Sequence, residues 1–135
     1  VVERLGPADV GHSDADVLLH AICDALLGAL GMGDIGTHFP NTDPAYKDIS
    51  SLVLLGRVGR MVEEAGWKVG NLDATVVAER PILSQYIPTM RSRIAKVLSL
   101  DPGVVSIKAT TSEGLGFVGR QEGIAAYAIA LLWRV

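Results

Sequence analysis

The sequence GHSDADVLLHAICDAL, residues 11–26, decides how the rest of the chain is interpreted. It is apolar over most of its length and contains no proline, which predicts a helix buried on nearly all sides. Ser13 offers an N-cap, and Asp16 three positions later forms a pair like a capping box. We therefore predict a helix over 14–30, ended by one of the glycines in the GMG sequence that follows.

One column of ionisable side chains interrupts this apolar helix. Asp16, His20 and Asp24 recur every fourth residue, a spacing that places side chains on one helix face. A solvated polar stripe is one explanation. The other is a metal or catalytic site, because a buried imidazole is a common metal ligand and neighbouring carboxylates orient it. One histidine cannot complete a catalytic zinc site, which usually has three protein ligands.

Composition excludes several classes of protein. A chain of 135 residues that is 49% hydrophobic and 20% charged predicts one globular domain. The net charge of −3 disfavours a nucleic-acid binder. No apolar run reaches about 18 residues, so no membrane partner is expected. Cys23 is the only cysteine, which precludes an internal disulfide and suits a reducing compartment.

Downstream patterns indicate an α+β fold. Residues 31–44, rich in Gly, Pro and Asp, predict a loop, and a helix is expected from Ser50 or Ser51 to a cap at Gly66. The following elements are expected to be a strand at 72–78, a helix at 88–98 and a strand at 104–110. The alanines of 123–133 are compatible with a helix, but the position of this segment after a strand and a short loop favours a strand that forms a hairpin with the strand before it.

Three segments have the composition of binding sites. His12 and Ser13, expected just before the first helix, suit a phosphate at a helix N-terminus, although Ser13 as a plain cap explains them too. The acids of 34–44 suit ribose hydroxyls or a cation, or belong to an ordinary connection. The sequence KATTSEGLGFVGR, 108–120, offers three hydroxyls, a carboxylate, flexible glycines and an arginine fork, without a Walker A ending. A Gly-rich hairpin is the alternative there.

Taken in order, three stretches resemble one enzyme family. HSDADVLLHAICDALLGALGMGDIGTHFPNTDP (12–44), GNLDATVVAERP (70–81) and KATTSEGLGFVGRQEGIA (108–125) are similar to 2-C-methyl-D-erythritol 2,4-cyclodiphosphate synthases of the non-mevalonate isoprenoid pathway. The resemblance implies a homotrimer of α+β subunits. Each subunit would have a mixed sheet facing a threefold cavity, helices packed on one face, and active sites between subunits. The implied reaction, a phosphorus-oxygen lyase step, cyclises 4-diphosphocytidyl-2-C-methyl-D-erythritol 2-phosphate and releases CMP.

The same resemblance implies roles for individual residues. His20 would hold Zn²⁺ or a similar cation, and Glu113 a Mg²⁺ or Mn²⁺ ion that bridges the substrate diphosphate. His12 and Thr111 would stabilise the transition state. The remaining implied substrate contacts are Ser13, Asp34, Ile35, Gly36, Phe39, Pro40, Asn41, Thr42, Asp43, Ala78, Glu79, Arg80, Pro81, Ile82, Leu83, Ser84, Thr110, Ser112, Glu113, Phe117 and Arg120.

The sequence departs from the family pattern at several points. Ile82 stands where a lysine is usual, and Asn41 where an aspartate is common. The other two zinc ligands would come from an Asp-x-His pair on an opening strand, and 1–135, expected to be a single domain, contains no such pair. We therefore expect weak zinc binding by these residues alone. The family also implies the bacterial cytoplasm or the plastid as location.

Two other functions remain open on the sequence. One is a non-catalytic trimeric nucleotide-binding protein with an incomplete metal site, which zinc content would separate from the synthase. The other is a metal-dependent phosphohydrolase, which would give free phosphate instead of a cyclic product.

Overall fold

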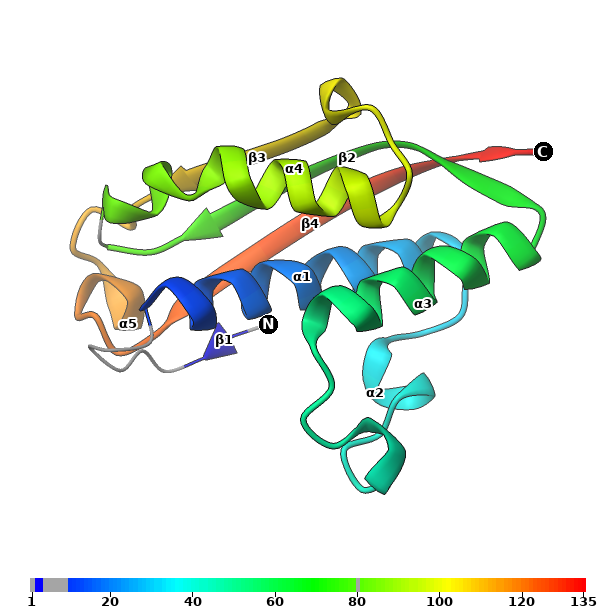
Figure 1. Cartoon of the computed structure of the whole chain (residues 1–135). Helices are drawn as coiled ribbons and strands as arrows, with labels where there is room; N and C mark the ends of the chain where they lie inside the picture. Colours follow the sequence, from blue (N-terminus) through cyan, green and yellow to red (C-terminus); the bar gives the residue numbers. More distant parts are fainter. Residues whose placement is uncertain (1, 4–9, 80) are drawn as a thin grey trace.

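The computed structural model describes residues 2–3, 10–79 and 81–135. The chain order of its elements is β1 (Val2–Glu3), α1 (Val10–Ala29), α2 (Ile35–His38), η1 (Pro44–Tyr46), α3 (Ser51–Glu64), β2 (Trp67–Val77), η2 (Pro81–Gln85), α4 (Ile87–Val97), η3 (Pro102–Val104), β3 (Val105–Thr110), α5 (Gly116–Gly119) and β4 (Ile124–Arg134), where η marks a 3-10 turn. Figure 1 shows their arrangement.

The strands form one mixed sheet in the order β1-β4-β2-β3. β2 and β3 are parallel, paired from Leu72↔Val105 to Val77↔Thr110, and α4 supplies the crossover that parallel neighbours require. β4 runs antiparallel to β2 on its other side, and β1 pairs antiparallel with the start of β4. The expected mixed sheet is therefore confirmed.

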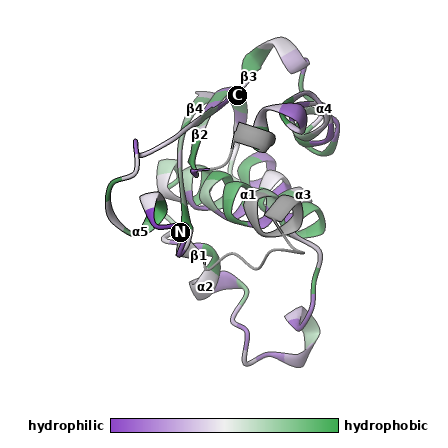
Figure 2. Cartoon of the chain, turned by 90° about the vertical axis from the view of Figure 1, so that its left-hand side faces the viewer, coloured by the Kyte–Doolittle hydropathy of each residue, from purple (hydrophilic) through white to green (hydrophobic). Residues whose placement is uncertain are grey.

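All three long helices pack on one face of the sheet, as Figures 1 and 2 show. α1 lies between the sheet and α3. Its residues Leu18, Ile22 and Leu26 are fully buried, and they share the core with Leu72 and Val76 of β2. This position explains why α1 is apolar on most sides, since it contacts other elements around most of its circumference.

The other face of the sheet is open in the single chain. Along β4, small alanines point toward the helices, while Tyr127, Ile129, Leu131 and Trp133 are between 49% and 74% exposed. A row of large exposed apolar side chains of this kind marks an interaction surface. We call these four residues the open-face row.

The structure corrects the expected pairing of the last strand. β4 is a strand, as predicted, but it does not form a hairpin with β3; its main partner is β2, from Trp67↔Arg134 to Val77↔Ala125. The two strands are both 11 residues long, whereas β3 has 6. The connection from β3 to β4 contains α5 and is long enough to cross to the far side of β2.

The first helix begins earlier than predicted. α1 starts at Val10, so Ser13 lies inside its first turns and is not its N-cap, and His12 does not precede the helix. The free N–H groups at this end therefore belong to 10–13, the stretch that contains His12 and Ser13.

Several expected loops contain short regular elements. Asp34 and Asp43 cap the single turns α2 and η1 within 31–44, and α5 lies within the Gly-rich segment after β3. β2 starts at Trp67, five residues before the predicted strand, with an irregularity between Val69 and Asn71. β1 lies in a segment for which we expected no strand. Among the described residues, no helix is long and apolar enough to span a membrane.

Candidate active site

The predicted polar column lies where α1 meets the start of α3. Ser51, the first residue of α3, is only 8% exposed, and its Oγ donates to Asp16 Oδ1 at 2.8 Å. The same oxygen is 3.2 Å from Nε2 of His20, which is half-buried. The column is therefore not a simple solvated stripe, because two of its members share a buried hydroxyl.

The third member of the column has a different task. Asp24 Oδ1 accepts the N–H of Ile35 at 2.9 Å and so attaches α2 to α1. Asp34 caps the same turn, accepting from Thr37 N at 3.0 Å and Thr37 Oγ1 at 2.9 Å. These bonds, the backbone one above all, lower the pKa of Asp34. The Asp24 carboxylate, which the sequence suggested as a partner that orients His20, instead fixes the turn that contains Ile35 and Gly36.

The segment after α2 is held by its aromatic residues. Phe39 meets Tyr46 edge to face, with ring centroids 5.3 Å apart, and the Arg57 guanidinium lies 5.7 Å from the Tyr46 centroid. Asp43 accepts the Ala45 N–H at 2.9 Å. Between these anchors, the implied substrate contacts Asn41, Thr42 and Asp43 are exposed.

A second cluster forms at the carboxyl ends of the parallel strands β2 and β3. Ala78 N donates to Thr110 O at 2.9 Å, which extends the strand pairing by one step. The Glu79 carboxylate then accepts hydrogen bonds from Gly114 N at 2.8 Å, from Ser112 Oγ at 3.2 Å and from Ser112 N at 3.3 Å. The implied cytidine and phosphate segments are therefore joined, and Glu79 is the residue that joins them.

Thr111 is the hydroxyl in this cluster best placed to serve a ligand. Its Oγ1 accepts the Glu113 N–H at 3.2 Å, which leaves its own hydroxyl hydrogen for an outside acceptor. Ser112 Oγ instead contacts Glu79 and, at 2.8 Å, the carbonyl of Leu115. Thr111 and Glu113 are both exposed, as substrate contacts must be.

Other implied contacts lie close by in the chain. Arg120 pairs with Glu122 through Nε at 2.9 Å and Nη2 at 3.3 Å, and this pairing raises the pKa of Arg120. Phe117 is 38% exposed, whereas Leu83 is buried, so the Leu83 side chain serves packing. The side chains of His12, Ser13, Pro81 and Ile82, and the whole of Arg80, lie outside the described residues.

The donor set for a metal is incomplete in the described part of the chain. No three His, Cys, Asp or Glu side chains come together there in a way that could hold an ion. His20 is a suitable single ligand, because Ser51 already fixes its ring. Glu113 belongs to the other cluster, so the two implied metal residues come from separate sites within one chain.

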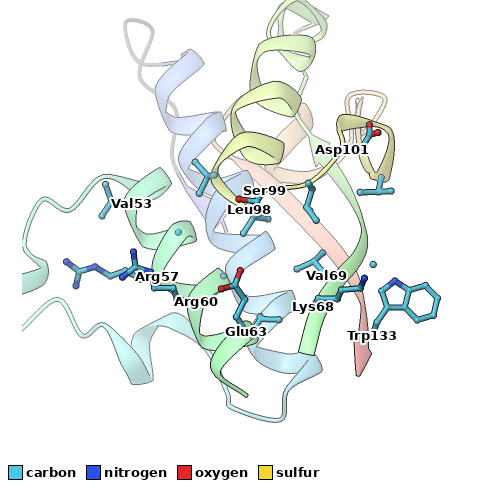
Figure 3. A pocket seen from close by; sticks show the side chains of 17 residues that line it. Val53, Arg57, Arg60, Glu63, Lys68, Val69, Leu98, Ser99, Asp101 and Trp133 are labelled. Carbon is cyan, nitrogen blue, oxygen red and sulfur yellow. The ribbon is translucent and has the colours of Figure 1, made fainter. Parts of the chain in front are cut away.

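A large groove lies away from both clusters. It measures about 830 Å³ and runs between α3, the end of α4 and the first residues of β2 (Figure 3). Its lining includes Arg60, Glu63, Lys68, Leu98 and Trp133, and none of the implied site residues. The groove borders the start of β2. The second cluster, formed by Glu79, Thr111, Ser112 and Gly114 and called the Thr111 cluster below, lies beyond the other end of that strand.

Comparison with known proteins identifies the family. Residues 6–133 match the YgbB family. The 2-C-methyl-D-erythritol 2,4-cyclodiphosphate synthase of Syntrophomonas wolfei is 60% identical over 123 residues, which are 91% of this chain and 78% of the relative. The enzyme of the same name from Symbiobacterium thermophilum is 63% identical over 122 residues, 90% of this chain and 78% of that protein.

Solved structures agree with the sequence comparison. The bifunctional IspDF of Campylobacter jejuni superimposes with a TM-score of 0.85 at 43% identity, over 93% of this chain and 34% of that longer chain. The CDP complex of Plasmodium falciparum IspF gives a TM-score of 0.76 at 29% identity, over 97% of this chain and 87% of that one. The predicted resemblance is thus confirmed, and the chain belongs to the YgbB family of 2-C-methyl-D-erythritol 2,4-cyclodiphosphate synthases.

Proposed function

We propose that this protein converts 4-diphosphocytidyl-2-C-methyl-D-erythritol 2-phosphate to 2-C-methyl-D-erythritol 2,4-cyclodiphosphate and CMP. It is a lyase of isoprenoid biosynthesis. The observation that carries this conclusion is identity of about 60% to enzymes of that name over nine-tenths of the chain. The contacts of Glu79 with Ser112 and Gly114 support it, because they join the two segments for which the resemblance implies base and phosphate contacts.

The reaction is an internal phosphoryl transfer. An oxygen of the substrate's 2-phosphate attacks the β-phosphorus, the bond from that phosphorus to the CMP oxygen breaks, and CMP leaves. Such a reaction needs positioning and charge neutralisation, and no protein nucleophile. Thr111 would donate its free hydroxyl hydrogen to the diphosphate, and the buried Cys23 would take no part.

Recognition of the nucleotide would use residues 78–84 and 110–113. The similar structures include CDP complexes, among them that of the Plasmodium falciparum protein. In our chain Leu83 is buried, which favours recognition of the base through backbone groups of this segment. His12 and Ser13, near the start of α1, would bind the diphosphate with the free N–H groups there.

Divalent cations complete the proposal. When bound, Zn²⁺ or a similar ion at His20 and Mg²⁺ or Mn²⁺ at Glu113 supply Lewis-acid polarisation of the diphosphate. His20 fits such a role because a hydrogen-bonded partner fixes its ring. Asp34 and Gly36 would contact the sugar part, and the segment from Phe39 to Asp43 would cover the substrate. We place the enzyme in the cytoplasm or a plastid.

The complete site would form between subunits of a homotrimer. Within one chain, the polar column on α1 and its partners Ser51 and Ile35, which we call the His20 cluster, come from α1, α2 and α3. The Thr111 cluster comes from the ends of β2 and β3 and the loop that follows. Figure 1 shows α2 below α1 and the strand ends at the left of the sheet. The open-face row supplies an apolar surface through which neighbouring subunits would pack.

Phosphorus NMR of the products tests the proposed reaction. The protein is incubated with the cytidyl substrate and Mg²⁺ or Mn²⁺, and the expected products are equal amounts of CMP and the cyclic diphosphate. Inorganic phosphate without a cyclic species would favour a phosphohydrolase. Nucleotide binding without turnover would favour a non-catalytic binding protein. Either result would contradict the proposal.

A further inference from the structure

Ser51 is the only buried polar or charged side chain among the described residues. Its hydroxyl oxygen lies between Asp16 Oδ1 at 2.8 Å and His20 Nε2 at 3.2 Å. A buried hydroxyl at this position must satisfy its hydrogen-bonding groups inside the protein. The arrangement therefore connects an exposed carboxylate to a half-buried imidazole through one fixed oxygen atom.

The number of hydrogens determines the direction of both bonds. A carboxylate oxygen only accepts, so the single hydroxyl hydrogen of Ser51 points to Asp16. Toward His20 the same oxygen can then act only as an acceptor, and Nε2 must be the donor. A neutral imidazole carries one ring hydrogen, so Nδ1 is left with a lone pair that can accept a hydrogen bond or bind a cation.

We propose that Ser51, oriented by Asp16, is a positioning residue that holds His20 in the Nε2–H tautomer and presents Nδ1 as the atom that binds a divalent cation. The role of Nδ1 in catalysis rests on the function proposed above. The tautomer itself does not depend on that function. It follows only from the two contacts of Ser51 within one chain.

The packing of α3 keeps this contact rigid. Ser51 is the first residue of α3, and Leu54, Leu55 and Val58 in the next two turns are buried against the core. Ser50, the N-cap residue, forms no capping bond through its side chain. Two adjacent serines thus have different surroundings, and Ser50→Ala provides a matched control for Ser51→Ala.

The test is ¹⁵N NMR of the histidine rings in the full chain, in mildly alkaline buffer where an ordinary imidazole is neutral. The His20 signals are assigned by their loss in His20→Gln. We expect hydrogen on Nε2 in the wild type, and Zn²⁺ alone should shift mainly the Nδ1 signal. Ser51→Ala should give a mixture of tautomers, so that excess Zn²⁺ shifts the signals of both ring nitrogens.

Two further variants separate positioning from packing. Ser51→Thr keeps the hydroxyl and should restore both the single tautomer and the selective Zn²⁺ shift of Nδ1, and Ser50→Ala should change neither. Hydrogen on Nδ1 in the wild type, or an unchanged tautomer in folded Ser51→Ala, would overturn the proposal. Failure of the proposed reaction would appear separately, as absent cyclic product from a protein whose His20 tautomer is the expected one.

Discussion

At the scale of single residues, Gly119 has the least freedom to change. A Cβ built on it would overlap the backbone carbonyl group of Gly114, which cannot move without disturbing the loop after β3. Gly28, on the exposed part of α1, has open space around the same position. The two glycines therefore form a matched pair for the same substitution.

We predict opposite effects of alanine at these two positions. Gly119→Ala should lower the free energy of unfolding by about 1–3 kcal/mol, because the added methyl group meets backbone. Gly28→Ala should raise it by about 0.5–1 kcal/mol, because alanine favours a helix. Urea unfolding of both variants checks this. Equal stability of Gly119→Ala and wild type would show that the loop adapts.

Cys23 is a second residue whose surroundings control its chemistry. Burial, with a smaller effect from Asp24, raises the pKa of its thiol from 9.0 to about 12. A raised folded pKa favours the protonated thiol, so this contribution to stability is present below pH 9.0 and is lost as the pH rises through about 12.

The expected consequence is an unreactive thiol in the folded protein. The thiolate fraction near pH 9 should be lower by about 500-fold than in the unfolded chain, and labelling by a disulfide reagent correspondingly slow. Labelling before and after unfolding in urea measures this difference. Rapid stoichiometric labelling of the folded protein would mean that Cys23 is accessible.

At the scale of elements, Glu79 connects the end of β2 to the loop that follows β3. Glu79→Gln replaces one accepting oxygen by an NH₂ group, which faces the N–H of Ser112 or Gly114 as a second donor. We predict a loss of about 1–2 kcal/mol in unfolding free energy and faster hydrogen exchange at Gly114.

The control for this prediction is Glu63→Gln, which removes an exposed carboxylate from α3. It should leave both quantities unchanged. Substrate KM should rise in Glu79→Gln only, because the Thr111 hydroxyl loses its fixed position. An unaltered hydrogen-exchange rate at Gly114 in Glu79→Gln would show that Glu79 does not hold the loop after β3 in place.

Local patterns predicted most elements correctly, and long-range pairing explains the rest. Helical spacing predicted the helix now seen as α3, and alternation of apolar residues predicted the strand now seen as β2. The partner of β4 depends on residues far away in the chain, so no local pattern could distinguish β2 from β3. The Asp34 and Asp43 caps were hidden because Asp is equally typical of turns and of N-caps.

For the candidate site as well, the sequence predicted individual residues but not the contacts between distant ones. The column on α1 drew attention to His20, but Ser51, 31 residues later, resembled an ordinary helix start. Glu79 and Ser112 are 33 residues apart, so their contact could not be inferred from the sequence. The fold supplied what the sequence lacked, namely which polar groups are neighbours.

At the scale of the whole molecule, the open-face row implies association. Ile129 is 74% exposed in the single chain, so a charge there would cost little in a monomer. In the proposed homotrimer the same charge would be buried between subunits. We predict that the wild type is a trimer by analytical ultracentrifugation and that Ile129→Lys is a folded monomer.

The control is Val53→Lys, on the outer side of α3 and 50% exposed, which should remain trimeric. A wild-type monomer, or an Ile129→Lys variant with unchanged mass, would show that this sheet face does not mediate assembly.

The most direct test of the central claim mixes two inactive variants, His20→Ala and Thr111→Ala. If each active site combines the His20 cluster of one subunit with the Thr111 cluster of its neighbour, unfolding and refolding the two together should create intact sites. Random assembly into cyclic trimers makes about a quarter of the sites intact, so CMP release should return to about a quarter of the wild-type rate. Activity no higher than that of the two variants refolded separately would contradict a cyclodiphosphate synthase site shared between subunits.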